Sequence, residues 1–400
     1  MDNMVIPKED CTGCGLCKSV CKKKCIDFKR DEFGVEYPVI NRIQCVSCHA
    51  CENICPSLSN KSFVFNKPQK VYVAWNLDDG IRFKSASGGV ASGFYRHVFD
   101  LGWYATGAFF TENNELKMDL FNNENFKESC RNSKYVFCNS SQVYLNVVEK
   151  LRNSIPVLFI GLPCQVAAAK RIAERYQCSD KLVTCDIVCH GVAPLEYLHN
   201  HINHVLGKSK HIDEIQFRNP NYGTSNFMFT LSRNNSVIYR KRVKSSDAYQ
   251  QGYHSALIYR ENCYACKYAR PERVSDITIG DFSGLGRVKP YLGEKTNISC
   301  VLINTDRGAD FWNGASHLFG YEERPLEEAL KVEKQLQHPS VKFPEHEIFL
   351  KAYKIHHDFD RAVWYAIRRR MIYGFIYEKT FCFELKQFLR PLKRLIRKNG

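Results

Sequence analysis

The sequence lacks any apolar stretch long enough to cross a membrane. Its longest apolar run, residues 155–162, has eight residues, whereas a transmembrane helix needs about 20. It also lacks an apolar leader, because Lys8, Glu9, Asp10 and several cysteines stand where a signal peptide would have its apolar core. We therefore expect a cytoplasmic protein, and in that compartment clustered thiols are metal ligands or catalysts more often than disulfides.

Acidic residues are also in short supply. The chain has 42 Asp and Glu against 57 Lys and Arg, a net charge of +15. In other respects the composition is ordinary, with 44% hydrophobic and 25% charged residues, which excludes a disordered, collagen-like or simple coiled-coil protein. A length of 400 residues predicts two to three domains, at about 100–200 residues each. The unusual feature is the cysteine content, with 19 residues.

Eight of these cysteines form a repeat near the N-terminus. Two runs with the spacing C-x2-C-x2-C-x3-C begin 34 residues apart, and the second run ends in Pro56. This doubled spacing is the signature of bacterial ferredoxins, in which three cysteines of one run and the last cysteine of the other bind each 4Fe-4S cluster. We therefore predict two clusters, one held by Cys11, Cys14, Cys17 and Cys55 (the first quartet) and one held by Cys45, Cys48, Cys51 and Cys21 (the second quartet).

Two zinc sites are the alternative, but zinc favours separated C-x2-C pairs rather than two runs of four. The first run lacks the usual proline and continues as Lys22, Lys23, Lys24 and an extra Cys25, which we expect to be a small core residue beside the cluster. Residues 26–28 and 35–39 flank a turn and suit a hairpin. An electron-carrying domain of this kind leaves the substrate chemistry to the remaining chain.

The remaining chain alternates between strand and helix patterns. Strands are predicted at 71–77, 155–162, 182–189, 212–217, 276–279 and 298–304, with the last completing the sheet, and helices at 90–99, 165–176 and 195–206. The βαβαβ order over 155–217 indicates a parallel or mixed sheet with helices on its faces. Ligands of such sheets lie where strand ends meet loops, and here those loops contain Gly161-Leu162-Pro163-Cys164-Gln165 and Cys185 to Gly191.

Five motifs in order resemble one known family. They are Ser-Ala-Ser-Gly-Gly-Val at 85–90, Gly-Leu-Pro-Cys-Gln at 161–165, Cys-His-Gly-Val at 189–192, Cys-Tyr-Ala-Cys-Lys-Tyr-Ala at 263–269 and Asp-Ile-Thr-Ile-Gly-Asp-Phe at 276–282. Behind a double ferredoxin module, they resemble the coenzyme F(420) hydrogenase/dehydrogenase beta-subunit family. The chain departs from that family's pattern at Leu162, at Ser283 and at Arg218-Asn219-Pro220, so the acceptor is left open.

The resemblance implies an iron–sulfur flavoprotein that binds FAD. Candidate FAD contacts are Ser85, Ser87, Gly88, Gly89, Pro163 and Gln165, although the Ser-Gly-Gly start of a helix is also a plain N-cap. The cysteines inside the motifs are Cys164, Cys189, Cys263 and Cys266 (the third quartet), which match the ligand number of a third 4Fe-4S cluster. Alternatively, Cys164 and Cys189 are buried, inert thiols, and Cys263 and Cys266 form a structural pair. We expect His190 to be structural and assign no catalytic acid or base.

The predicted function is that of an iron–sulfur, FAD-dependent oxidoreductase. A low-potential donor such as ferredoxin would supply single electrons, and the hydride acceptor would be the deazaflavin coenzyme F(420) or an organic substrate. Flavin is expected because clusters pass one electron at a time, whereas a hydride carries two. The alternatives are a reductase of a glycan or polysaccharide precursor that uses the same cofactors, and a non-catalytic electron-transfer subunit of a larger complex.

The C-terminal region is basic. From residue 361 to residue 400 there are 11 Lys and Arg against 2 Asp and Glu, a local +9. Helices are expected at 310–318 and 326–336, followed by one long helix at 348–376. Apolar residues recur at helical spacing from 381 to 396, with basic residues opposite them and a kink at Pro391. We expect this helix to lie on an anionic membrane surface or an acidic partner, or to pack on the protein itself. Nucleic-acid binding is not expected.

Together these patterns predict an α+β ferredoxin-like domain followed by an α/β domain with a mixed or parallel sheet and a helical basic tail. The expected segments are 1–64 for the ferredoxin domain, 69–150 for the first part of the family-like region, 151–335 for its second part with FAD and the third quartet, and 336–400 for the tail.

Overall fold

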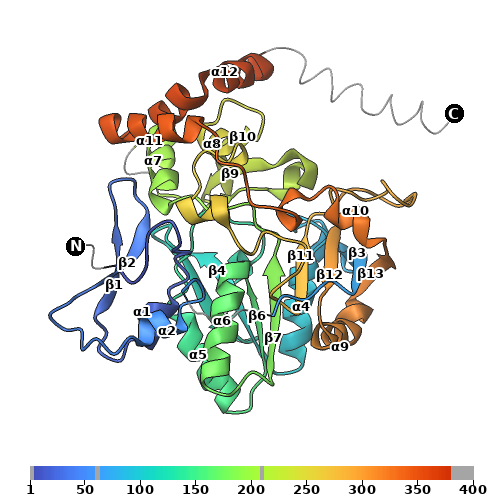
Figure 1. Ribbon diagram of the computed structural model, residues 1–400. Coiled ribbons are helices and arrows are strands. Elements are labelled where there is room, and N and C mark those ends of the chain that lie inside the picture. The colour runs from blue at the N-terminus through green and yellow to red at the C-terminus, as the bar shows by residue number, and fades with distance from the viewer. Residues whose placement is uncertain (1–3, 59–63, 208–210, 380–400) are drawn as a thin grey trace.

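The computed structural model describes residues 4–58, 64–207 and 211–379. The N-terminal segment contains a hairpin of β1 (Ile26–Arg30) and β2 (Glu36–Ile40), with two short helices, α1 (Leu16–Val20) and α2 (Ala50–Ile54), at its base. Phe28 pairs with Pro38 at the middle of the antiparallel register, which confirms the predicted hairpin. Figure 1 shows this segment against one side of the molecule, on the opposite side from α10 (Leu326–Leu330).

The centre of the molecule is a mixed sheet of eight strands. Its order is β13-β3-β12-β11-β7-β6-β4-β5. The strands are β3 (Lys70–Asn76), β4 (Tyr104–Phe110), β5 (Leu116–Phe121), β6 (Val157–Gly161), β7 (Leu182–Ile187), β11 (Ile277–Gly280), β12 (Ser299–Ile303) and β13 (Phe319–Glu323). The four neighbours β11, β7, β6 and β4 run parallel, and the outer strands are antiparallel to their neighbours. The mixed α/β sheet is therefore as predicted, but β12 is not its last strand, because β13 follows it in the chain and pairs with β3.

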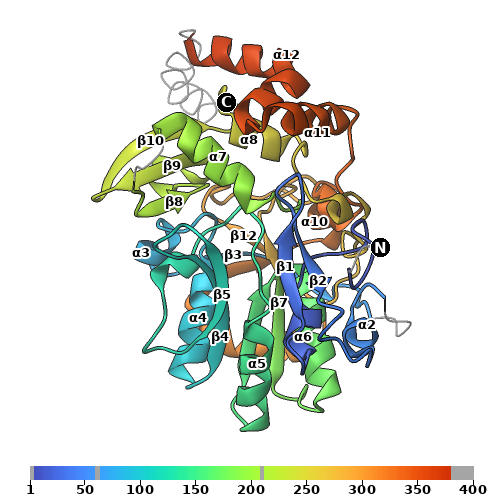
Figure 2. The ribbon, with the colours of Figure 1, turned by 90° about the vertical axis from the view of Figure 1, so that its left-hand side faces the viewer.

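Helices cover both faces of this sheet. Along β6, Phe159 points to the side of α5 (Val143–Arg152) and α6 (Pro163–Arg175), whereas Ile160 points to the side of α4 (Val90–Asp100) and α9 (Asp306–Ala315). This alternation is why residues 155–162 read as a continuous apolar run: both faces of the strand are buried. Figure 2 shows the sheet between α4 and the pair α5 and α6. A short α3 (Asp79–Arg82) links β3 to the loop before α4.

A second layer lies above the sheet in Figure 1. It contains an antiparallel sheet of β8 (Glu214–Gln216), β9 (Met228–Arg233) and β10 (Ser236–Arg242), together with α7 (Leu195–Leu206) and α8 (Ala248–His254). The prediction that residues 212–217 form a third strand of the parallel sheet is therefore wrong. Strand β11 occupies that position beside β7, and the chain after α7 instead pairs β8 with β9.

Two helices rather than one complete the layer: α11 (Glu345–His356) and α12 (Phe359–Lys379). The single helix predicted at 348–376 is wrong because His357 adopts a left-handed conformation with φ of 49°. The Asp358 side chain then accepts a hydrogen bond from the Arg361 backbone N–H at 2.9 Å and begins the next helix. The helix predicted at 326–336 is likewise divided into α10 and a 3-10 turn at Lys334–Leu336.

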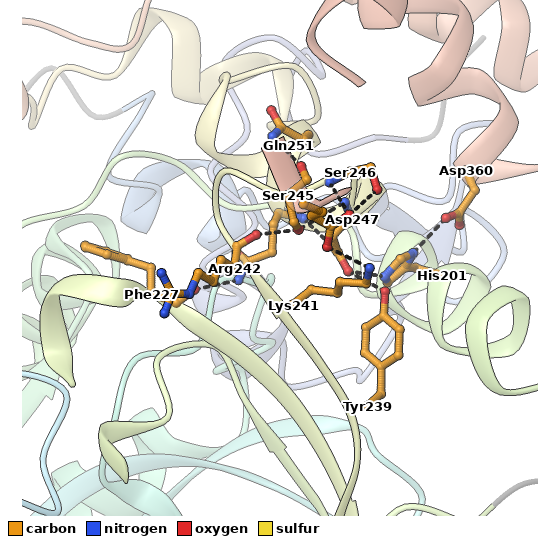
Figure 3. A network of polar contacts seen from close by, with 12 residues as sticks. His201, Phe227, Tyr239, Lys241, Arg242, Ser245, Ser246, Asp247, Gln251 and Asp360 are labelled. Atoms are coloured by element: carbon orange, nitrogen blue, oxygen red, sulfur yellow. Dashed lines mark hydrogen bonds and ion pairs between the residues drawn. The ribbon is translucent and has the colours of Figure 1, made fainter. Parts of the chain in front are cut away.

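A buried ionic network fixes α12 to the second layer (Figure 3). The His201 ring, from α7, lies between Asp247 at 3.0 Å and Asp360 at 2.9 Å. Burial lowers the pKa of His201, but the two carboxylates more than offset this and raise it to about 10. Tyr239 donates a further hydrogen bond to Asp247 at 2.8 Å. The first turn of α12 is thus held by a charged histidine rather than by apolar packing alone.

No helix among the described residues is long and apolar enough to span a bilayer. The amphipathic helix expected at 381–396, with its kink at Pro391, lies outside the described residues.

Candidate functional site

The carboxyl ends of the parallel strands meet at one edge of the sheet, below the second layer. Gly161 ends β6, Ile187 ends β7 and Gly280 ends β11. All three line one large cavity that encloses about 1500 Å³ of atom-free space, open solvent included. Parallel sheets place their ligands at this edge. The sheet thus provides a candidate ligand site at the ends of three neighbouring parallel strands.

The first cysteine quartet surrounds a smaller cavity. Cys11, Cys14, Cys17 and Cys55 all line it, as the repeat predicts. Burial, followed by the repulsion of the neighbouring Cys55, raises the pKa of the Cys14 thiol to about 12. Gly13 and Gly15 hold the loop with φ of 72° and 82°, in the left-handed region that favours glycine. The structure therefore brings together four thiols whose ionised forms would repel one another unless a cation lay between them.

The main body covers this loop directly. Ser140 and Tyr144 donate hydrogen bonds to the carbonyl oxygen of Cys14, at 2.9 and 3.0 Å. A Cβ atom at Gly15 would lie 2.7 Å from the Cβ of Ser141. The loop that carries the first quartet's Cys14 therefore packs against the start of α5.

Arg260 is a buried cation at the same loop. Its side chain is 1% exposed, and it donates to the carbonyl oxygens of Glu36 at 2.9 Å and Cys11 at 3.4 Å. Its Nε has no hydrogen-bond partner among the residues that the structure describes. Glu261, its neighbour in the chain, pairs instead with Lys342 and His346. A buried charge is costly unless an opposite charge offsets it. An anionic 4Fe-4S cluster in the first quartet would supply that charge, so the residues present fit this cofactor.

The second quartet lies further out. Cys21, Cys45 and Cys51 are partly exposed, and Cys48 is exposed. Cys21 and Cys51 are close enough that the charge of Cys21 raises the pKa of Cys51, although burial is the larger cause. Cys25 is buried with its sulfur 3.4 Å from the sulfur of Cys21. This position matches the expectation that Cys25 is a core residue beside the cluster.

The third quartet also converges. Cys164, Cys189, Cys263 and Cys266 line one cavity, which we call the central cavity, together with Cys14 of the first quartet. Cys164 stands at the start of α6, and burial, together with the repulsion of Cys189 and Cys266, raises the pKa of its thiol well above the ordinary range. Burial, together with the repulsion of Cys263 and Cys266, also raises the pKa of the Cys189 thiol well above its ordinary range. The four motif cysteines thus lie together, and Cys14 of the first quartet lines the same cavity.

No group of three His, Cys, Asp or Glu residues in the described chain is arranged to hold a single metal ion. A single ion lies at the centre of its ligands, whereas a cuboidal cluster is larger and its thiolates are spread around it.

The candidate FAD residues divide between two cavities. Ser85, Ser87, Gly89 and Gln165 line the large cavity, whereas Pro163 lines the central cavity. Gly88 lies behind them, and a Cβ there would meet the carbonyl oxygen of Ala74 at 2.5 Å. Cys189 lines both cavities. The two candidate loops therefore face one space that adjoins the third quartet.

Several of these side chains already have protein partners. The Ser87 hydroxyl donates to the carbonyl oxygen of Ile298 at 2.6 Å, and the Ser85 hydroxyl to that of Ile81 at 2.8 Å. Gln165 accepts from the Leu162 N–H at 2.9 Å and donates to Ser140 at 3.3 Å. These contacts set the loop shapes, and the backbone at the start of α4 is left to face the cavity.

The sequence patterns missed three of the cavity's charged residues, Arg131, Lys134 and Glu333. Asp281, from the last family motif, and Arg218, from the atypical triplet, line it as well. Arg218 pairs with Asp281 at 2.7 Å. Burial lowers the pKa of Lys134 to about 8. Residues 131–134 carry no motif, and only the fold brings them to the cavity. His190 also lines it, 3.7 Å from Glu333.

Two segments of the chain match described families. Residues 156–329 match the family defined by the C terminus of the coenzyme F420 hydrogenase/dehydrogenase beta subunit, and residues 10–58 match the 4Fe-4S dicluster domain. The second segment contains both N-terminal quartets, and the first contains the third quartet.

The chain is also similar to one curated protein and, more weakly, to a chain of one solved structure. The chain is 28% identical over 184 residues to the F subunit of the F(420)H(2) dehydrogenase of Methanosarcina mazei, a match that covers 42% of this chain and 50% of that protein. The match thus spans about half the length of the relative. A chain of the F420-reducing [NiFe] hydrogenase complex from Methanosarcina barkeri aligns at 17% identity with a TM-score of 0.43, over 74% of this chain and 91% of that chain.

Proposed function

Because the chain resembles the coenzyme F420 hydrogenase/dehydrogenase beta-subunit family and carries a 4Fe-4S dicluster domain, we propose that it is a flavin-dependent iron–sulfur oxidoreductase. It would exchange electrons between a one-electron carrier protein, such as ferredoxin, and a hydride acceptor in the large cavity. The deazaflavin coenzyme is one candidate acceptor, and an organic substrate is the other.

The observation that carries this proposal is the continuous series of sites. The second quartet adjoins the first within the N-terminal segment, and Cys14 lines both the first-quartet cavity and the central cavity. Cys189 then lines both the central cavity and the large cavity. A series of this kind is expected of a protein that moves electrons from its surface to a buried reaction site.

The residues of the large cavity suit an anionic cofactor. Arg131, Lys134 and Arg218 are cationic groups on its wall, and the first residues of α4 also line it, where the N-terminus of a helix favours an anion. A flavin bound there would convert between one-electron and two-electron transfer. The Ser85–Gly89 loop and the turn before α6 would hold it, while the apolar wall of Val90, Tyr95 and Ile160 would exclude water.

The iron and flavin content of the anaerobically purified protein tests this proposal. Three quartets predict about twelve irons per chain and two predict about eight. The variant Cys263→Ala should lose about four irons, whereas Cys185→Ala, which removes a fully buried thiol outside the quartets, should lose none. An iron count near eight in the parent protein would refute the third cluster. A holoprotein that neither releases flavin nor binds added FAD would refute the oxidoreductase and favour a simple relay subunit.

We also propose that the C-terminal region contacts an anionic membrane surface. The exposed side of α12 carries Trp364, Tyr365, Arg368, Arg369 and Tyr373, and the sequence has no acidic residue from 361 to 377. Aromatic and basic residues on one helix face are typical of interfacial helices. The protein should therefore float with phosphatidylglycerol vesicles and not with phosphatidylcholine vesicles. Truncation after residue 378 and the pair Arg368→Gln and Arg369→Gln should each weaken flotation, and no effect of either would refute the contact.

A further inference from the structure

The second quartet is enclosed on its outer side by two exposed loops. One is Lys22-Lys23-Lys24, which connects Cys21 to Cys25, and the other is residues 41–49, which carries Cys45 and Cys48. The loops meet, because the Asn41 N–H donates to the carbonyl oxygen of Cys25 at 2.7 Å. We call the surface formed by Lys22, Lys23, Lys24, Arg42, Ile43 and Val46 the basic rim.

The basic rim combines cations with exposed apolar side chains. Ile43 is 97% exposed and Val46 is 60% exposed. The nearby carboxylates have other partners: Asp27 pairs with Lys18 at 2.8 Å and Glu52 with His49 at 2.9 Å. Within the described residues, no ion pair involves the four cations of the rim. The two loops therefore expose four cations and two large apolar side chains.

The other two quartets have no comparable access. Arg260, Ser140 and Tyr144 cover the loop of the first quartet. The third quartet lies between the sheet edge and the N-terminal segment. An electron that passes between two proteins requires their redox centres to approach closely, so exchange with another protein is favoured at the second quartet, whose Cys48 is exposed.

We propose that the basic rim is the docking surface for an acidic one-electron carrier protein. This inference rests on the proposed function and adds the site and the charge of the partner. Complementary charge chiefly raises the association rate and is screened by salt. The exposed Ile43 and Val46 would form the small apolar contact of a transient complex, since electron-transfer encounters bury less surface than stable interfaces. Lys22 stands at the position where this motif usually has proline, and Lys23 and Lys24 follow it.

The test uses the anaerobically prepared holoprotein and two reductants. One is dithionite, a small reductant that needs no docking surface. The other is fully reduced flavodoxin, an acidic protein that gives up one electron per encounter, and the electron reduces one cluster of the chain. Stopped-flow absorbance gives the second-order rate constant as salt is raised, and isothermal titration with oxidised flavodoxin gives the affinity independently.

The decisive variant combines Lys22→Gln, Lys23→Gln and Lys24→Gln. The matched control combines Arg287→Gln, Lys289→Gln and Lys295→Gln, which removes three exposed cations from a loop bonded to α10 on the other side of the molecule. At low salt, the rim variant should react with flavodoxin about tenfold more slowly than the parent protein. Its rate should converge with that of the parent at high salt, and its affinity should fall. The control should behave as the parent. Ile43→Ser with Val46→Ser should weaken affinity at every salt concentration.

The outcomes separate the two proposals. If dithionite does not reduce the parent holoprotein, the proposed function fails. If dithionite reduces every variant equally but flavodoxin reacts with the rim variant as fast as with the parent, the docking surface is refuted. A parent protein that sediments as a dimer and becomes monomeric in the rim variant would assign the rim to a second copy of the chain, which also overturns the proposal.

Discussion

Replacing Arg260 with methionine is expected to lower the reduction potential of the cluster held by the first quartet. Arg260 is the cation closest to this loop: a Cβ at Gly13 would lie 3.0 Å from its Nη2, and its guanidinium packs over the rings of Tyr37 and Phe137. Reduction adds negative charge to the cluster, so a fixed positive charge beside it favours the reduced form. Methionine removes this charge while it retains much of the apolar stem.

The size of the shift follows from Coulomb's law. Two unit charges about 4 Å apart interact by about 4 kcal/mol at an effective dielectric constant of about 20. Because the added electron is spread over the cluster, we take about twice that separation, which gives about 2 kcal/mol. With about 1.4 kcal/mol equal to about 59 mV for one electron, the potential should fall by roughly 90 mV.

Redox titration monitored by electron paramagnetic resonance measures this shift. Arg260→Lys keeps the charge but loses the paired hydrogen bonds, so its potential should stay close to that of the parent protein. The carbonyl oxygens of Glu36 and Cys11 lose their donor in the methionine variant and have a weaker one in the lysine variant, which should cost about 1–3 kcal/mol of stability. If the role of Arg260 were purely structural, both variants would be less stable than the parent protein, but the reduction potential would be unchanged in both. Equal potentials in the parent and the methionine variant, at full iron content, would refute the electrostatic role.

Three further results are expected. His201→Gln leaves Asp247 and Asp360 buried without their cation. It should lower the free energy of unfolding by about 3 kcal/mol at pH 7, as measured by denaturant unfolding. A loss under about 1 kcal/mol would contradict the stabilising role of the network. Because the pKa of His201 is about 10 in the folded protein and about 6.5 in the unfolded chain, its stabilisation is complete below pH 6.5 and is lost as pH rises through 10. The difference in stability between the parent and His201→Gln should therefore shrink between pH 7 and pH 10, and a constant difference would argue against a charged histidine. Gly15→Ala should lower the melting temperature more than Gly102→Ala does. Both glycines have φ above 70°, but only at Gly15 would the added Cβ meet another residue, Ser141. Equal decreases in melting temperature would mean that backbone strain is the whole cause.

The grouping of the cysteines could be predicted because most of their pattern is local. The spacing of each run places three thiols in one tight loop, and the structure brings Cys11, Cys14 and Cys17 to one cavity with Cys55. The buried strands around residues 155–162 and 182–189 were also predictable, since every residue of β6 is apolar or glycine and only Thr184 and Asp186 are polar in β7. These features depend on residues close together in the sequence.

The errors concern pairing between distant segments. The periodicity of residues 212–217 indicates a strand but not its partner, and the position beside β7 belongs to β11, which begins 90 residues after the last residue of β7. In the same way, no sequence pattern around Arg260 indicates that this arginine is buried against Gly13, almost 250 residues earlier in the chain. The break between α11 and α12 had a readable signal, because Asp358 is a favourable N-cap residue.

The contact of Arg260 with the first cysteine loop also has a consequence for synthesis of the chain. A ribosome adds about 5–20 residues per second. Cys11, Cys14 and Cys17 are therefore made roughly 12–50 s before Arg260, the residue that faces them in the folded protein. Ser140 and Tyr144, which hold the same loop, follow the cysteines by roughly 6–25 s. During translation, the thiols of the nascent chain thus remain accessible to iron–sulfur assembly factors before the body of the protein can close over them.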